Sequence, residues 1–170
     1  MKRLLGPMAV LLGTAIAAHA ATLYFAPSVI MDRALATLKD RGVALHAFTT
    51  PKRISPQTQV VVRSSPDLFY SLCRYDLSEN NDTLKVTMGE WPDYQSLSFF
   101  DGNTNNFAKF RGTGQSVTVR LVREDLEYLD PNAVVSPTTR GVVLIRRLAP
   151  TQEAFDAAVE AAKADSCDMM

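Results

Sequence analysis

The residues from Leu4 to Met31 include no charged side chain, and Lys2 and Arg3 stand directly before them. A helix over this run would be about 40 Å long at about 1.5 Å per residue, whereas the hydrocarbon core of a bilayer is about 30 Å thick. A buried helix in a small water-soluble domain does not need an apolar run of this length. The segment therefore indicates a chain that enters a membrane or is exported across one.

The apolar run has two interpretations. It is a cleaved secretory signal, with Lys2 and Arg3 as the basic start and Ala18-His19-Ala20 as the cleavage site, or it stays in the chain as a membrane helix. We favour the membrane helix, because the apolar character continues to Ile30 and a signal peptide does not need that extension. Both interpretations leave the basic residues in the cytoplasm, which predicts a single-pass bacterial inner-membrane protein with its body in the periplasm.

The charge balance argues against nucleic-acid binding, and the order of segments along the chain suggests three parts. Eighteen basic and eighteen acidic residues cancel, and no basic stripe of the kind that binds nucleic acid is present. We expect an N-terminal membrane anchor or signal peptide over residues 1–31 and a juxtamembrane helix and linker over 32–57. Residues 58–170 are expected to form a β-rich periplasmic domain with a C-terminal helix. A domain of this size is large enough to bury a core.

Short β-like segments separated by turn residues indicate the fold of the third part. They lie at residues 59–62, 67–77, 84–88, 94–100, 117–122 and 141–148. Large residues on both faces of 67–77 predict a central strand, and the turn residues 78–82 predict that it forms a hairpin with 84–88. The whole is mainly β, typical of an antiparallel β-sandwich or a barrel-like body, and it is expected to close with a helix that follows Thr151.

Two cysteines, Cys73 and Cys167, are the only ones in the chain. An even number of cysteines in an oxidising compartment favours a disulfide, so we predict this bond on condition of export. The alternative is a buried Cys73 and a free Cys167 near the C-terminus. The two do not predict a zinc site, because the other ligands are absent, and no cofactor is indicated.

Three stretches of the sequence resemble one bacterial family. They are Ser65–Leu77, Asp93–Phe107 (without Gly102) and Arg140–Arg146, and the similarity extends over roughly Val60 to Leu148. The family is Domain of Unknown Function twelve-fifty-four. The resemblance implies a membrane-linked envelope protein with a β-sandwich body. Because longer members carry a second uncharacterised domain, number twelve-fourteen, it also implies a separately encoded companion of that kind as a partner. It implies no reaction and no catalytic residue.

The best candidate site is the polar stretch from Asp101 to Asn106. Its alternating oxygen-bearing side chains resemble the start of a calcium loop, but Asn106 stands where the glycine belongs and Gly112 where the glutamate belongs. We therefore favour a turn whose Asp and Asn side chains bond their own backbone, without a metal. The candidate ligand-binding residues are Tyr94, Asp101, Asn103, Asn105, Asn106 and Arg140.

Catalysis has little support in the sequence. His46 is the only histidine outside the apolar run, and no G-x-S-x-G elbow is present. Glu90, Asp93 and Asp101 could supply paired carboxylates, although acidic residues in turns are usually solvated. Aromatic residues between 70 and 100 could line a lipid or sugar pocket but more often pack in a core. We expect Arg146 and Arg147 on a solvated face, with anionic headgroups or acidic turns as the alternative partners.

These observations favour a non-enzymatic binding or assembly module that is anchored in the membrane and acts with a companion envelope protein. The alternatives are a small envelope hydrolase and a lipid- or glycan-binding protein.

Overall fold

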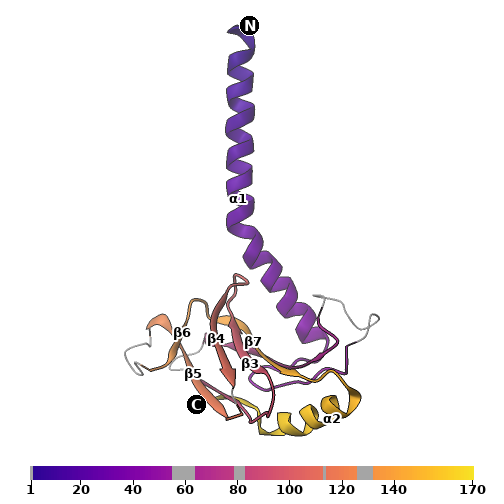
Figure 1. Ribbon diagram of the computed structural model, residues 1–170. Helices are drawn as coiled ribbons and strands as arrows, with labels where there is room; N and C mark the ends of the chain where they lie inside the picture. Colours follow the sequence, from indigo (N-terminus) through magenta and orange to yellow (C-terminus); the bar gives the residue numbers. More distant parts are fainter. Residues whose placement is uncertain (1, 55–63, 79–82, 113, 126–131) are drawn as a thin grey trace.

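A single long helix stands on a small body of two β-sheets (Figure 1). The computed structural model describes residues 2–54, 64–78, 83–112, 114–125 and 132–170. The helix α1 spans Lys2–Asp40, so the predicted membrane helix and juxtamembrane helix are one continuous element. It contains Pro27 and bends on its way to the body, as expected where proline removes a backbone hydrogen bond (Figure 1).

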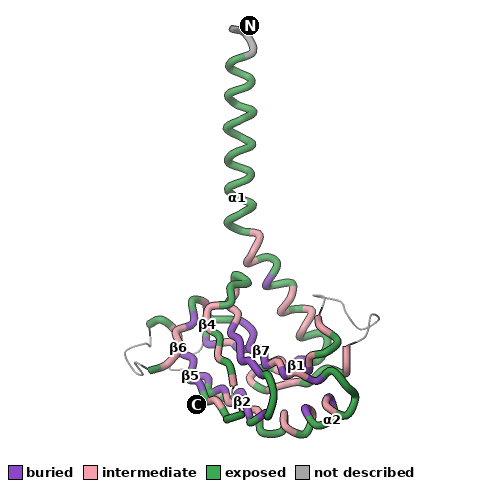
Figure 2. Tube along the Cα trace, in the orientation of Figure 1, coloured by how far each residue is buried: buried purple, intermediate pink, exposed green. Residues whose placement is uncertain are grey.

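The two ends of α1 have different surroundings. Residues 5–25 are exposed along their whole length, whereas partial burial begins at Ala26 and Met31 is only 6 % exposed (Figure 2). Among the described residues, α1 is the one helix that is long and apolar enough to cross a membrane. The helix therefore has a free apolar part and a part that packs on the body.

Each sheet of the body has four strands among the described residues. The first sheet has the order β1-β7-β3-β4, and its strands are β1 (Leu68–Asp76), β7 (Arg140–Leu148), β3 (Gln95–Phe100) and β4 (Asn106–Gly112). The second sheet has the order β6-β5-β2-β8, and its strands are β6 (Val134–Ser136), β5 (Val117–Arg123), β2 (Leu84–Met88) and β8 (Ser166–Met169). All neighbours are antiparallel except β5 and β6.

The core lies between the two sheets. Alternate residues of β1 and β2 are buried, as period-two side-chain placement requires when one face of a strand meets a facing sheet. Leu97, Phe99 and Ile145 from the first sheet share one cluster with Val86 and Leu121 from the second. The predicted mainly β sandwich with a C-terminal helix is confirmed.

The helix α2 (Gln152–Ala161) closes one end of the sandwich. Thr151 caps it as predicted, because its side chain accepts a hydrogen bond from the backbone N–H of Ala154 at 3.1 Å. Phe155 and Ala158 of α2 are buried in a second cluster with Phe69 of β1. A short 3-10 turn, η2 (Ala162–Ala164), then leads into β8.

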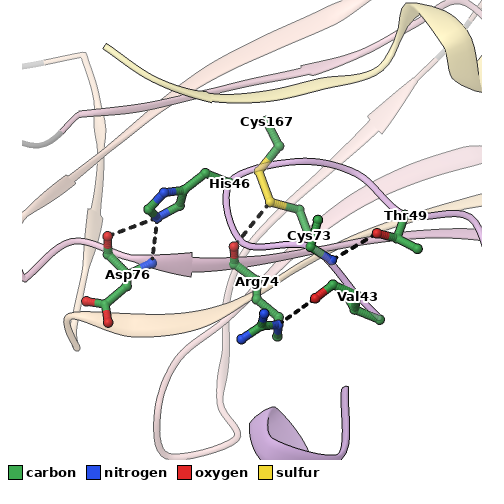
Figure 3. Close-up of a disulfide and its surroundings, with 8 residues drawn as sticks. Val43, His46, Thr49, Cys73, Arg74, Asp76 and Cys167 are labelled. Atoms are coloured by element: carbon green, nitrogen blue, oxygen red, sulfur yellow. Dashed lines mark hydrogen bonds between the residues drawn. A yellow bond between two sulfur atoms is a disulfide. The ribbon is translucent and has the colours of Figure 1, made fainter. Parts of the chain in front are cut away.

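A disulfide joins the two sheets. Cys73 of β1 and Cys167 of β8 are bonded, with their Cα atoms 6.6 Å apart (Figure 3). Both side chains are buried in the core cluster. The predicted pairing is present, and it links the first strand of the body to the last.

Several strand predictions were wrong. The strand β1 lies at an edge of its sheet rather than at its centre, and β2 belongs to the other sheet, so the two form no hairpin. The chain continues beyond the predicted helix into β8, and β4 and β6 lie outside the segments that were predicted to be strands. The predicted β-segment 59–62 and most of the turn 78–82 lie outside the described residues.

Candidate functional site

A short segment after α1 covers the edge of β1. The backbone N–H groups of His46 and Thr49 donate to the carbonyl oxygens of Arg74 and Leu72, at 2.9 and 2.8 Å. The Arg74 side chain donates through Nε to the carbonyl oxygen of Val43 at 2.9 Å (Figure 3). This segment ties the end of the helix to the strand that carries the disulfide.

His46 helps this segment to cover the edge of β1 and, among the described residues, does not belong to a cluster of catalytic side chains. Its Nε2 lies 3.0 Å from both the backbone nitrogen and the carbonyl oxygen of Asp76 (Figure 3). His46 has a φ of 54°, a left-handed conformation that is uncommon for a side-chain-bearing residue. Since Nε2 is hydrogen-bonded to the backbone of Asp76, as acceptor or donor according to its tautomer, the imidazole holds the edge of the sheet.

Asp101 organises the loop that was the best candidate site. Its Oδ1 accepts hydrogen bonds from the backbone N–H groups of Asn103 and Asn105, both at 2.8 Å, and its Oδ2 accepts one from Asn105 Nδ2 at 3.0 Å. The residue is only 2 % exposed. Both carboxylate oxygens therefore close the loop, as in the favoured interpretation from sequence.

The other candidate residues fall at two ends of the sheet. Asn103, Asn105 and Asn106 are exposed around the same loop. Thr138 joins this loop to the start of β7, because its Oγ1 accepts from the backbone of Gly102 at 2.7 Å and donates to the carbonyl oxygen of Arg140 at 2.8 Å. Tyr94 precedes β3, whereas Asp101 follows it, so Tyr94 lies at the opposite end of that strand.

Arg140 also marks where the helix meets the body. Its Nη2 lies 3.6 Å from Oδ1 of Asp32 in α1, and both side chains are mostly exposed. An exposed pair of this kind contributes little to stability. It places the Asp101 loop at the end of the sandwich that faces the bend of α1.

The three carboxylates that a hydrolase would use, Glu90, Asp93 and Asp101, do not lie together in the structure. Glu90 and Asp93 are exposed before β3, and Asp101 is buried after it. One oxygen of Asp93 accepts a hydrogen bond from the backbone of Tyr94 at 2.8 Å. Among the described residues, no group of three or more His, Cys, Asp or Glu side chains could hold a metal ion.

Arg147 is buried, so the expectation of a solvated face was wrong for this residue. Its Nη1 and Nη2 lie 2.7 and 2.6 Å from the two carboxylate oxygens of Asp165, and neither side chain is exposed. Asp165 also accepts a hydrogen bond from the backbone of Gly89 at 2.9 Å. The pair fixes the segment before β8 against the first sheet.

Tyr75 is buried in the core between the two sheets, and its hydroxyl keeps its proton at neutral pH. Burial raises the pKa of Tyr75 to about 12, because the phenolate would lose its hydration. Its hydroxyl lies 3.0 Å from Ser136 Oγ and 3.3 Å from the carbonyl oxygen of Phe100, to which it donates. A side chain at Gly141 would overlap these oxygens, which accounts for glycine there.

The outward face of the first sheet gathers hydroxyl groups and cations. Strand pairing puts Arg146 opposite Ser96, and Ser96 opposite Arg111. In the next row Ser98 lies opposite Lys109. Because Leu97, Phe99 and Ile145 point into the core, these alternate residues point away from it. We call this set the basic face; its members are Tyr94, Ser96, Ser98, Lys109, Arg111 and Arg146.

The hydrogen bonds of the basic face leave its cations available. Arg146 Nη2 donates to Ser98 Oγ at 3.1 Å, and the Tyr94 hydroxyl donates to Ser96 Oγ at 3.3 Å. Arg146 Nε is buried without a hydrogen-bond partner in the described part of the chain. The side chains of Lys109 and Arg111 are exposed and make no hydrogen bond or ion pair with the residues described.

Sequence reasoning found only part of this face. The alternation of Tyr94, Ser96 and Ser98 along one strand is visible in the sequence. Arg146 reaches these residues only because β7 pairs with β3. Arg146 and Ser98 are 48 residues apart, and the sequence has no local signal for that strand pairing.

Comparisons with known proteins give a family and a fold. The model of the family described as "Protein of unknown function (DUF1254)" matches residues 46–167, which confirms the resemblance of the three motif stretches. No curated protein matches the chain.

Two crystal structures of longer proteins resemble this one. The VPA0106 protein of Vibrio parahaemolyticus has a TM-score of 0.63 and 13 % identity, over 86 % of this chain and 35 % of that chain. A putative uncharacterized protein of Burkholderia cenocepacia has a TM-score of 0.47 and 10 % identity, over 74 % of this chain and 34 % of that chain. The first match supports the fold, and this chain spans about a third of the length of each protein.

Proposed function

This chain belongs to the DUF1254 family of proteins of unknown function, and from that premise we propose that it is a membrane-tethered binding module rather than an enzyme. In this proposal the free part of α1 spans the bacterial inner membrane once. Lys2 and Arg3 lie on the cytoplasmic side and the β-sandwich lies in the periplasm. The body presents its surface to a ligand or to a companion envelope protein.

The exposure of the free part of α1 is the observation that carries the proposal. Leu11, Ile16 and Tyr24 are 69, 69 and 78 % exposed, although Met31 further along the same helix is only 6 % exposed. Burying one large apolar side chain is worth about 1.5–3 kcal/mol. A row of them in water is costly, whereas residues 5–25 match the thickness of a bilayer core at about 1.5 Å per residue.

The disulfide supports a position outside the cytoplasm. Bonds of this kind persist in the periplasm and are rare in the reducing cytosol. Cys73 and Cys167 are held together within the core of the sandwich, where the bond closes most of the body into one loop.

The site geometry favours binding over catalysis. Asp101 and His46 are committed to the backbone, and Glu90 and Asp93 are far from Asp101 along β3. The basic face carries cations that remain available to a ligand. This chain matches only 35 % of the longer first structural neighbour, and this supports a companion protein as the partner.

Protease accessibility tests this topology. We expect the body to resist added protease in intact cells and to be digested in spheroplasts, while the chain stays in the membrane fraction after a high-salt wash. Digestion only after the spheroplasts are lysed would place the body in the cytoplasm and overturn the proposal.

Two variants separate a membrane helix from a soluble one. Placing arginine at both Leu11 and Ile16 should oppose insertion by about 5–7 kcal/mol and reduce the membrane-bound fraction strongly. Ala36→Arg is the matched control, because Ala36 is exposed beyond the bend of the same helix. Equal fractionation of the two variants would contradict a membrane helix over residues 5–25.

A further inference from the structure

We propose that the basic face binds the phosphate group of a small ligand. This inference rests on the binding role proposed above and adds the chemical class of what is bound. It uses Arg146 on β7 and Lys109 and Arg111 on β4, which lie on either side of β3 in the first sheet.

The sheet brings the three cations within reach of one small group. Arg146 and Arg111 are both paired with Ser96, so their Cα atoms are about two strand spacings, or roughly 10 Å, apart. Lys109 lies two residues from Arg111 on the same side of β4, about 7 Å along the strand. Long side chains from these positions can converge over β3.

The buried hydroxyl groups position the ligand-facing side chains. Ser98 is fully buried and accepts from Arg146 Nη2, so it holds that guanidinium over the row that ends at Lys109. Ser96 is 1 % exposed and accepts from the Tyr94 hydroxyl. Ser96 and Ser98 are buried beneath these longer side chains, so contact with the phosphate falls to Arg146, Arg111, Lys109 and Tyr94.

The charge of the face selects phosphate over a carboxylate. The two central sets of residues paired across β1, β7, β3 and β4 at this face include no acidic side chain. One set of paired residues is Tyr70, Arg146, Ser96 and Arg111, and the next is Leu72, Leu144, Ser98 and Lys109. Three cations exceed the single charge of a carboxylate. A phosphate monoester carries about −1.5 to −2 charges and three acceptor oxygens, which suits a surface of guanidinium and ammonium donors.

Protection of a sheet edge does not explain the whole arrangement. Cations on an edge strand such as β4 discourage pairing with other chains, which accounts for Lys109 and Arg111. It does not account for Arg146, which is half-buried on an inner strand with its Nε unpaired among the described residues. An unpaired buried donor costs free energy that a bound anion would offset.

Titration calorimetry on the purified full chain in non-ionic detergent tests the inference, with inorganic pyrophosphate as the probe at low salt. We expect a dissociation constant of about 1 mM or lower for the wild type. Lys109→Gln combined with Arg111→Gln should weaken binding about tenfold or more, because two charge-assisted contacts are lost. These residues are exposed, so the fold is expected to survive.

Controls make each outcome decisive. Lys85→Gln removes an exposed cation from β2 in the second sheet and should change affinity less than about twofold. Arg146→Gln should weaken binding at an unchanged melting temperature. Absence of pyrophosphate binding, equal loss in the Lys85 variant, or equal binding of acetate would overturn the inference. None of these binding results depends on which side of the membrane the body lies. Failure of the phosphate-binding inference is therefore distinct from failure of the proposed membrane topology.

Discussion

Replacing both Cys73 and Cys167 with alanine is expected to lower the free energy of unfolding of the body by about 4–5 kcal/mol. The cysteines are 94 residues apart, and a bond across a loop of that length strongly restricts the unfolded chain. The bond also joins the two sheets, since β1 and β8 belong to different ones. Denaturant unfolding of the full chain in detergent micelles measures the change.

The wild-type protein provides its own control. Full reduction should destabilise it by the same amount as the double substitution, and reductant should have no effect on the double variant. A loss below about 1 kcal/mol after complete reduction would show that packing alone holds the sheets together.

Removing one partner of the buried ion pair is expected to have an effect of similar size. Arg147→Met or Asp165→Leu alone should cost about 3–5 kcal/mol, because each leaves a charge buried without its counter-charge. Making both changes together should restore a large part of the loss, although the backbone N–H of Gly89 would still lack the acceptor that Asp165 supplies. The measurement is again the free energy of unfolding.

A surface pair serves as the comparison. Lys163 and Glu160 are both 69 % exposed, and Lys163→Met should cost less than about 1 kcal/mol. If the double variant of Arg147 and Asp165 were no more stable than the single variants, the carboxylate would be required for its backbone contact rather than for its charge.

Elements with strong local signals were predictable from sequence. The length and apolarity of the first segment predict α1, and the several short β-like segments separated by turn residues predict a sandwich or barrel. Thr151 predicts the start of α2. Cys73 and Cys167 predict their bond because the chain offers no other partner for either.

Pairing between strands was not predictable in the same way. The turn residues after β1 indicate a change of direction, but they do not say whether the chain returns to the same sheet or crosses to the other one. The strand β8 has only four residues, and β4 is an edge strand whose burial pattern is mixed. Neither gives the clear period of two that identifies a half-buried strand.

Most of the basic face depends on these pairings. Arg146 and Arg147 are adjacent in sequence and look equivalent, yet one points outward to Ser98 and the other inward to Asp165. The direction follows from the register of β7 against its neighbours, because a shift of one residue would exchange the two faces. Sequence pattern alone assigned both arginines to solvent.

Whether the β-sandwich lies outside the cytoplasm at the end of a membrane helix is tested most directly by trapping its thiols in growing cells. Cells are quenched in acid, and the protein is treated with a polymer-linked maleimide before and after reduction. The expected result is a full-length chain in the membrane fraction that reacts at Cys73 and Cys167 only after reduction. A soluble chain whose two thiols react at once would contradict it.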